Sequence, residues 1–146
     1  MARSGKSPVK QGSLRIIGGL WRGRKLTFTP ADGLRPTPDR VRETLFNWLA
    51  PSIRGARCLD LFAGSGALGL EALSRGAGYC DFVDTSAAAI RQIGLHLQTL
   101  QAGDRACCHQ GPALTFLQED RACHDMVFID PPFGKNFVDP ICEQLA

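Results

Sequence analysis

The stretch Cys58–Gly69, CLDLFAGSGALG, is a short apolar run that continues into a glycine-rich turn. Its three glycines, Gly64, Gly66 and Gly69, match the spacing G-x-G-x-x-G. Glycines between a strand and a helix let the backbone approach a ligand, which then meets the first N–H groups of the helix. The motif is weak on its own, but its place after a strand and before a helix strengthens it. It predicts the first strand and helix of a Rossmann-like fold that holds a nucleotide-like cofactor.

Strand-like and helix-like segments alternate after this turn, which is typical of a doubly wound α/β fold with a parallel sheet and right-handed crossovers. Such a sheet usually has further strands, so we expect it to be incomplete at its C-terminal side, with its last strand exposed at one edge. We therefore expect the chain as given to fold loosely and to have little activity. The expected strands are Cys58–Phe62, Tyr79–Val83, Arg105–His109 and Met126–Ile129, and the expected helices are Gly66–Arg75, Ser86–Gln101, Ala113–Glu119 and one starting at Phe137.

Two parts precede the predicted core, which spans residues 57–146. Residues 1–12 are polar and rich in Gly, Ser and Lys, which predicts a disordered basic tail. Residues 13–56 form an N-terminal extension. Within it, Leu14–Ile17 and Arg24–Phe28 read as short strands separated by a glycine turn, so we expect a hairpin.

The extension ends in a predicted helix, Asp39–Ala50, whose apolar residues recur at helical spacing. Thr37 has the residue type of an N-cap, and Pro38 suits the first helical position. Pro51 is expected to stop the helix, because proline lacks the N–H group that the helix needs.

Basic residues concentrate toward the N-terminus, although the net charge is only +3. Residues 1–57 hold 12 Lys or Arg against 3 Asp or Glu, whereas residues 58–146 hold 5 against 11. Apolar residues interleave with the cations over residues 13–57, so we expect this part to meet an anionic partner. The candidate contact residues are Arg15, Arg22, Arg24 and Lys25.

The six cysteines include no C-x-x-C pair, and the three histidines show no ligand spacing. These counts predict reduced, buried thiols in a cytosolic protein and no metal site. No stretch approaches the roughly 20 apolar residues of a membrane span. No apolar run follows the N-terminal cations, so we expect that the N-terminus is not a secretory signal. We expect a cytoplasmic monomer without membrane association.

Two acids accompany the glycine turn. Asp84 ends the next strand about 20 residues on, where an acid accepts both ribose hydroxyls of a nucleotide. That pattern would equally suit a nicotinamide cofactor. Asp60, however, lies on the first strand, four residues before Gly64. A dinucleotide site does not need this acid, whereas the ammonium group of S-adenosylmethionine could meet it directly or through water. The pair therefore favours S-adenosylmethionine.

The segment Val127–Phe133, VFIDPPF, carries the second chemical signal. Its strand ends at the edge where open sheets bind their ligands. The two prolines remove N–H groups and restrict the backbone. The Asp130 carboxylate and the Pro131 carbonyl can therefore accept the N–H bonds of an amino group, while Phe133 stacks on its ring. This arrangement predicts methyl transfer to an exocyclic or amide nitrogen.

Five strings give the chain a family resemblance over residues 14 to about 135. On these strings it resembles the bacterial 16S ribosomal RNA (guanine-N2)-methyltransferase family, known as RsmD. The N-terminal strings are specific to that family, while D-P-P-F is shared more widely among amino-methyltransferases. The strings are Arg15–Gly19, Trp21–Leu26, Arg35–Asn47, Asp60–Gly69 and Asp130–Phe133.

The resemblance implies a class I methyltransferase that acts on the N2 atom of one guanine of 16S ribosomal RNA, within a small-subunit particle. It implies that the target base lies at Asp130, Pro131 and Phe133. It also implies that the segment Arg35–Asn47 borders the cofactor pocket. The implied cofactor residues are Asp60, Phe62, Gly64, Gly66, Asp84, Thr37 and Arg40.

Two departures from the family pattern stand out. Relatives usually carry Asp or Asn where this chain has Pro112, and proline cannot contact the adenine amino group with a side-chain acceptor. Relatives also continue for several more strands beyond the point where this chain stops.

Three other functions stay open. The first is methylation of a DNA adenine or a protein glutamine, whose sites more often carry Asn in place of Asp130. The second is an NAD-dependent oxidoreductase, which the segment Asp130–Phe133 disfavours. The third is a non-catalytic RNA-binding or assembly protein, which Pro112 would allow.

Overall fold

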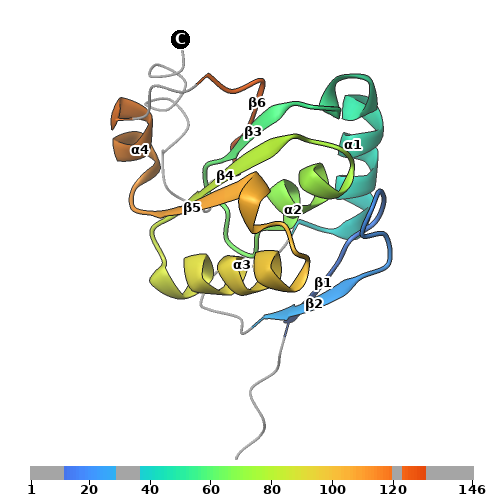
Figure 1. Ribbon diagram of the computed structural model, residues 1–146, viewed down its shortest axis with the longest axis horizontal. Coiled ribbons are helices and arrows are strands. Elements are labelled where there is room, and N and C mark those ends of the chain that lie inside the picture. Colours follow the sequence, from blue (N-terminus) through green and yellow to red (C-terminus); the bar gives the residue numbers. More distant parts are fainter. Residues whose placement is uncertain (1–11, 29–36, 120–122, 131–146) are drawn as a thin grey trace, which may run out of the picture.

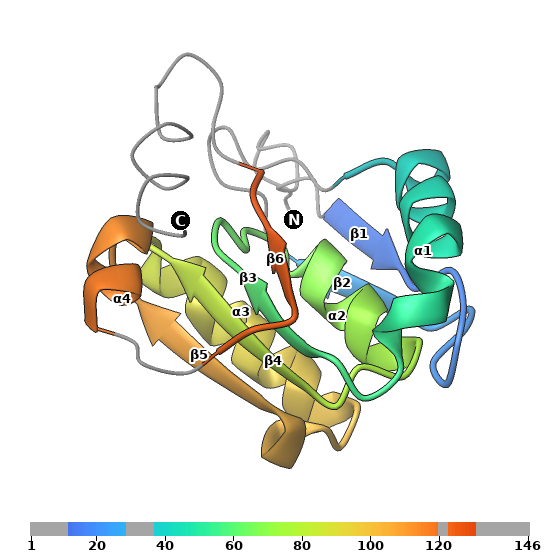
Figure 2. The same ribbon diagram turned by 90° about the horizontal axis from the view of Figure 1, so that it is seen from above.

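The computed structural model describes residues 12–28, 37–119 and 123–130 (Figure 1). Their centre is a parallel sheet of four strands in the order β5-β4-β3-β6 (Figure 2). The predicted parallel sheet is confirmed, and β6 lies at an edge of the described sheet. The strands are β3 (Arg57–Asp60), β4 (Tyr79–Asp84), β5 (Ala106–Gln110) and β6 (Met126–Phe128).

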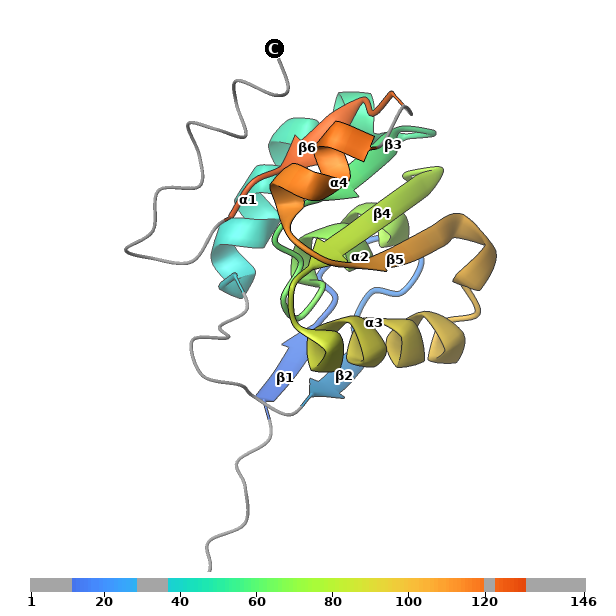
Figure 3. The ribbon, with the colours of Figure 1, turned by 90° about the vertical axis from the view of Figure 1, so that its left-hand side faces the viewer.

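Helices lie on both faces of this sheet, as the alternating pattern predicts (Figure 3). On one face, Cys58, Cys80 and Phe82 join a core that also contains buried residues of α1, α2 and α3. On the other face, Leu59 and Val83 pack with residues of α4. The helices are α1 (Asp39–Ile53), α2 (Ala67–Ser74), α3 (Ala87–Thr99) and α4 (Ala113–Glu119), with one 3-10 turn, η1 (Gly103–Arg105).

The N-terminal extension forms the predicted hairpin, in which β1 (Gly12–Arg15) pairs antiparallel with β2 (Lys25–Phe28). Leu14 and Leu26 are buried in the same core cluster as the sheet residues. The hairpin therefore packs on the α/β core through its apolar residues. Residues 1–11 of the predicted tail and the predicted helix at Phe137 lie outside the described residues, whereas Gly12, predicted as the end of the tail, is the first residue of β1.

Two details of the predicted helix are wrong. The N-cap is Pro38 rather than Thr37, and no side chain caps the helix. Pro51 does not stop the helix, which continues to Ile53. Pro51 costs the last turn of α1 one backbone hydrogen bond. The turn is nevertheless helical because Ile53, at its end, is buried in the core.

A buried carboxylate attaches the extension to α2. Glu71 is fully buried, and its two oxygens accept the backbone N–H groups of Ile17 and Gly18, each at 3.0 Å. The same oxygens accept Arg42 Nη1 at 3.0 Å and Arg75 Nε at 2.8 Å. Four donors on one carboxylate offset much of the cost of burying its charge. Glu71 therefore ties the segment after β1, helix α1 and helix α2 together.

Ser74, one turn after Glu71, makes a second attachment. Its hydroxyl donates to Gly18 O at 2.6 Å and accepts from Trp21 N at 3.0 Å. Its carbonyl accepts from Leu20 N at 2.7 Å. The turn between β1 and β2 is thus hydrogen-bonded to the C-terminal end of α2.

The predicted burial of the cysteines holds for Cys58 and Cys80 but is wrong for Cys107 and Cys123, which are exposed. Cys107 lies on β5, an edge strand of the described sheet, so no neighbouring strand of the described chain covers its outer side. None of the helices in the described part of the chain is long and apolar enough to cross a membrane.

Candidate functional site

The glycine turn connects β3 to α2 as predicted. Gly66 is the N-cap of α2 and has φ +83°, a left-handed conformation that favours glycine. Gly69 faces β4, where a Cβ atom would lie 2.2 Å from Cε1 of Phe82. Glycine at this position lets the helix approach the strand closely. The N-terminus of α2 is thereby held against the carboxyl ends of β3 and β4.

Asp84 closes the turn from the neighbouring strand. Its Oδ2 atom accepts Gly64 N–H at 2.9 Å, and its Oδ1 atom accepts Ser86 N–H at 2.8 Å. Ser86 in turn caps α3, because its hydroxyl accepts Ala89 N–H at 3.1 Å. Asp84 is half-buried. It therefore fixes the glycine turn relative to the start of α3.

Asp60 lies beneath the turn and is only 2 % exposed. Its Oδ2 atom accepts Gly69 N–H at 3.1 Å. The pKa of Asp60 is raised to about 7. Burial is the largest cause, the Gly69 hydrogen bond opposes it, and the charges of Asp130 and Asp84 add to the rise. The carboxyl is thus poised near neutral pH, where a cation placed beside it would favour the ionised form.

Asp130 follows β6, at the same edge of the sheet as Asp60. Leu61 N donates to Phe128 O at 3.1 Å, so the pairing of β3 with β6 continues past the last residue of β3. Asp130 is exposed, and Thr37 Oγ1 lies 3.5 Å from its Oδ2 atom. Thr37, wrongly predicted as a helix cap, instead contacts the carboxylate from the other end of the chain.

Helix α1 supports this contact through Arg42, which the sequence did not single out. The Arg42 side chain is 1 % exposed, and its Nε atom donates to Thr37 O at 3.2 Å. Its Nη1 atom reaches Glu71, as described above, and Arg15 O at 2.8 Å. Phe46 of α1 also packs on Phe128 of β6, with ring centroids 5.6 Å apart. Arg42 and Phe46 thus position Thr37 and the start of α1 next to Asp130.

The remaining predicted cofactor residues are less closely grouped. Phe62 is half-buried in the turn and packs with the cluster on the α4 face. Arg40 is exposed on the first turn of α1. Pro131 and Phe133 were predicted to hold the target base, and both lie outside the described residues.

A cavity of about 280 Å³ opens at the carboxyl ends of β4 and β5. Val83 and Phe116 form apolar parts of its wall, and the loop Gln110–Pro112 forms another part. Asp84 O accepts Gly111 N–H at 2.9 Å, so this loop is tied to the end of β4. The cavity therefore lies beside the end of β4, the strand that carries Asp84.

The predicted cationic residues of the extension are all exposed. They are Arg15, Arg22, Arg24 and Lys25, from β1, the following turn and β2. Only Arg15 of these has a carboxylate partner within the described chain, since its Nη2 atom lies 3.6 Å from Asp39. The extension therefore presents positive charge to solvent.

The parallel four-stranded sheet with helices on both faces, together with its similarity to solved methyltransferase structures, places the chain in the class I, Rossmann-like methyltransferase fold. A solved structure described as "Putative methyltransferase yhhF from Escherichia coli" superimposes with a TM-score of 0.84 and 48 % identity, covering 92 % of this chain and 72 % of that one. The family model described as Conserved hypothetical protein 95 matches residues 14–146, and the chain belongs to this family.

Two curated relatives carry the same name, Ribosomal RNA small subunit methyltransferase D. The one from Escherichia coli strain K12 is 52 % identical over 136 residues, covering 92 % of this chain and 68 % of the relative. The one from Haemophilus influenzae is 47 % identical over 137 residues, covering 92 % and 71 %. The family resemblance stated from the sequence is confirmed.

Proposed function

We propose that this chain transfers a methyl group from S-adenosylmethionine to the exocyclic N2 atom of a guanine in 16S ribosomal RNA. The observation that carries the proposal is the exposed Asp130, held beside Thr37 at the same sheet edge as Asp60 and the glycine turn. The names of the relatives support ribosomal RNA as the substrate. We also propose that the RNA is methylated within a small-subunit particle in the cytoplasm. We propose that the enzyme acts as a monomer.

The cofactor would lie along the carboxyl ends of three strands. Its methionine end would meet the glycine turn, with its ammonium group near Asp60. Its ribose hydroxyls would donate to Asp84, and its adenine would enter the cavity at Gln110–Pro112. Pro112 offers no side-chain acceptor, so the adenine amino group would rely on backbone oxygens of this loop.

Methyl transfer needs little more than alignment. The amine nitrogen would attack the methyl carbon while the carbon–sulfur bond breaks toward sulfur, and the nitrogen would then release a proton to solvent. An aromatic amine is a poor nucleophile because its lone pair is delocalised into the ring. Asp130 would accept its N–H bonds and favour a more pyramidal nitrogen, whose lone pair can point at the methyl group. Positioning and desolvation would supply the rest of the rate enhancement.

A thermal-shift comparison tests the cofactor first. S-adenosylmethionine should raise the melting temperature of the chain, because it binds the folded state. NAD should leave the melting temperature unchanged, because the carboxylates of Asp60 and Asp130 suit the ammonium group of S-adenosylmethionine and the target amine, and NAD offers neither group in these places. Stabilisation by NAD alone would reject the methyltransferase proposal.

Replacing Asp84 with alanine should weaken S-adenosylmethionine binding by about tenfold or more. Two ribose hydrogen bonds to a charged acceptor would be lost, each worth roughly 1.5–3 kcal/mol before water compensates. The glycine turn would also lose the bond between Gly64 N–H and Asp84. Isothermal titration calorimetry measures the change.

The matched control for this variant is Asp104→Ala, which removes an exposed carboxylate from η1. The control should bind the cofactor as tightly as the parent chain. Equal affinities for the parent, Asp84→Ala and Asp104→Ala would leave Asp84 with a purely structural role.

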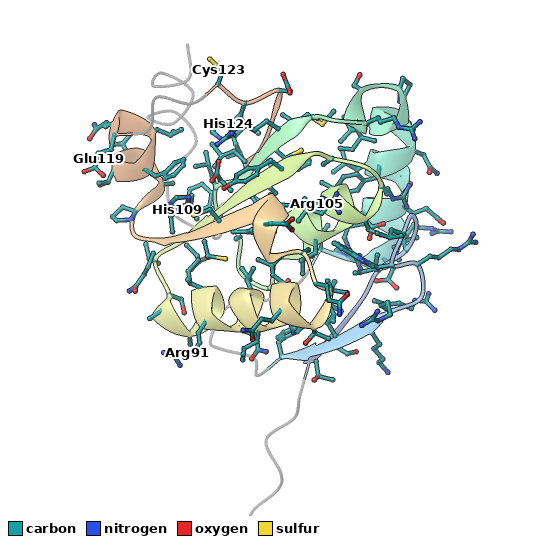
Figure 4. The ribbon with its side chains drawn as sticks, viewed as in Figure 1. Arg91, Arg105, His109, Glu119, Cys123 and His124 are labelled. Atoms are coloured by element: carbon teal, nitrogen blue, oxygen red, sulfur yellow. The ribbon has the colours of Figure 1, made fainter. Side chains whose placement is uncertain are left out.

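Neutralising Arg22, Arg24 and Lys25 together should weaken binding to ribosomal RNA and flatten its salt dependence. Each lost phosphate contact reduces the slope of log K against log salt by roughly 0.7–0.9. The measurement is filter binding or fluorescence anisotropy over a series of salt concentrations. Arg91→Ala is the control, because Arg91 is exposed on α3, away from the hairpin (Figure 4). If the triple variant and the control share one salt slope, the hairpin is not the RNA contact.

A further inference from the structure

Four residues with metal-binding side chains gather on the sheet face that carries α4. Asp81 of β4 is the register partner of Cys107 of β5, so the two side chains point to the same face. His109 lies two residues beyond Cys107 and shares that face. His124 comes from the segment that precedes β6 (Figure 4). Strand pairing thus assembles a group that has no spacing motif in the linear sequence.

The carboxylate of Asp81 is the centre of this group. Its Oδ1 atom lies 3.0 Å from His109 Nε2, and its Oδ2 atom lies 2.8 Å from His124 Nε2. The ligand atoms of Asp81, Cys107 and His109 all lie within 4.8 Å of one another. Asp81 is buried, whereas Cys107 is exposed and His109 is half-buried. An ion from solution could therefore reach the group past Cys107.

We propose that Asp81, Cys107 and His109 bind Zn²⁺, with His124 holding the Asp81 carboxylate and a water completing the tetrahedron. Zinc–nitrogen and zinc–sulfur bonds of about 2.0–2.3 Å place the ligand atoms of a tetrahedron roughly 3.3–3.8 Å apart. The ligand atoms of these three residues, which all lie within 4.8 Å of one another, need only small side-chain movements to reach that spacing. One carboxylate and one thiolate balance the charge of the ion, and imidazole with sulfur selects zinc over magnesium or calcium.

Neighbouring residues hold two of the ligands in place. The Phe116 ring of α4 packs on the His109 ring, with centroids 4.7 Å apart, which limits rotation of the imidazole. Arg57 Nη2 lies 3.4 Å from Asp81 Oδ2 and helps to orient the carboxylate. Contacts of this kind tune a metal site through its ligands. Without an ion, the Asp81 carboxylate accepts hydrogen bonds from His109 and His124, and Cys107 does not take part in these hydrogen bonds.

The site would connect three parts of the fold. It joins β4 and β5 directly. It joins the segment before β6 through the contact between His124 and Asp81, and β6 itself lies at the far side of the described sheet from β5. His109 also lines the cavity at the ends of β4 and β5. A bound ion would thus stabilise the sheet face and fix one wall of that cavity. The inference is independent of which substrate the enzyme methylates.

Metal titration of the full chain tests the site without any measurement of methyl transfer. The chain is treated with a chelator, dialysed, and titrated with Zn²⁺ by calorimetry and with Co²⁺ by absorption spectroscopy. We expect one ion per chain, with a cobalt spectrum that contains a thiolate-to-metal charge-transfer band and the visible bands of a tetrahedral site. Zn²⁺ should also raise the melting temperature.

Substitutions identify the ligands. Cys107→Ser should remove the charge-transfer band and weaken Zn²⁺ binding at least tenfold, and His109→Ala should weaken binding as much. Cys108→Ser is the matched control, because Cys108 packs toward the opposite face of the sheet. Cys123→Ser tests the exposed thiol beside His124. Both control variants should bind like the parent chain.

Three results would overturn the proposal. The first is the absence of stoichiometric Zn²⁺ binding by the parent chain. The second is equal affinity in Cys107→Ser and Cys108→Ser. The third is a charge-transfer band that survives Cys107→Ser and disappears in Cys123→Ser, because the thiolate ligand would then be a different one. Circular dichroism of each variant confirms that it is folded, and Cys107→Ser is an exposed, nearly isosteric change.

Discussion

Replacing Asp130 with alanine is expected to abolish methyl transfer while leaving S-adenosylmethionine binding largely intact. The carboxylate is exposed at the sheet edge, where it would accept the N–H bonds of the target amine. Removing one positioned electrostatic or proton-accepting group from an active site costs roughly 10²-fold or more in rate. Single-turnover methyl transfer measures the rate, and calorimetry measures cofactor affinity.

Asp130→Asn is the matched comparison, because the amide keeps the size of the side chain and one acceptor oxygen but loses the charge. Its rate should fall between those of the parent chain and Asp130→Ala. Thr37→Val should have a smaller effect, since Thr37 contacts Asp130 at the long distance of 3.5 Å. A near-parental rate for Asp130→Ala would remove Asp130 from the proposed mechanism.

Replacing Glu71 with alanine is expected to destabilise the fold by about 3–5 kcal/mol, because it breaks a buried ion pair and leaves Arg42 with the exposed Asp39 as its remaining carboxylate partner. Arg42, whose side chain is 1 % exposed, would lose its buried carboxylate partner. The N–H groups of Ile17 and Gly18 would lose their acceptor as well. Since domains are stable by only about 5–15 kcal/mol, a large share of the total would be lost. Urea unfolding followed by circular dichroism measures the free energy.

Glu43→Ala is the control for Glu71→Ala, because Glu43 is an exposed glutamate on α1. It should change the free energy of unfolding by no more than about 0.5 kcal/mol. Hydrogen exchange adds a local measurement, in which Glu71→Ala should expose the amides of Ile17 and Gly18 before those of β3 and β4. A loss below about 1 kcal/mol for Glu71→Ala would show that the extension is held by apolar packing alone.

Glu71 also connects the extension to the proposed catalytic edge. It bonds Arg42, and Arg42 bonds the carbonyl of Thr37, whose hydroxyl contacts Asp130. A loosened extension would therefore misplace Thr37 as well as the exposed cations of the hairpin. We expect Glu71→Ala to lower transfer to RNA even at temperatures where the core remains folded.

Local signals in the sequence predicted the local structure well. The strand, glycine turn and α2 helix follow the pattern of Cys58–Gly69, because glycines at fixed spacing encode the turn directly. The helix predicted to start at Ser86 is present as α3, and Ser86 is its cap, because the hydroxyl accepts Ala89 N–H. The helix Ala113–Glu119 has the predicted bounds.

Long-range partners explain what the sequence did not predict. Thr37 resembles an N-cap by residue type, but its hydroxyl contacts Asp130, which lies 93 positions later. Arg42 and Glu71 look like ordinary helix residues, and only the packing of α1 on α2 brings them together. The grouping of Asp81 with His109 and His124 likewise depends on strand order. None of these contacts leaves a spacing that a motif could detect.

The most direct test of the central claim is to identify the methylated product. Small ribosomal subunits that lack the modification are incubated with the chain and S-adenosylmethionine labelled at its methyl group. The RNA is then digested to nucleosides and separated from protein. We expect the label, transferred slowly by the chain as given, in N2-methylguanosine of 16S ribosomal RNA, and none when Asp130→Ala replaces the parent chain. Label in a methylated adenine or in a ribosomal protein, or the same label with Asp130→Ala, would contradict this account.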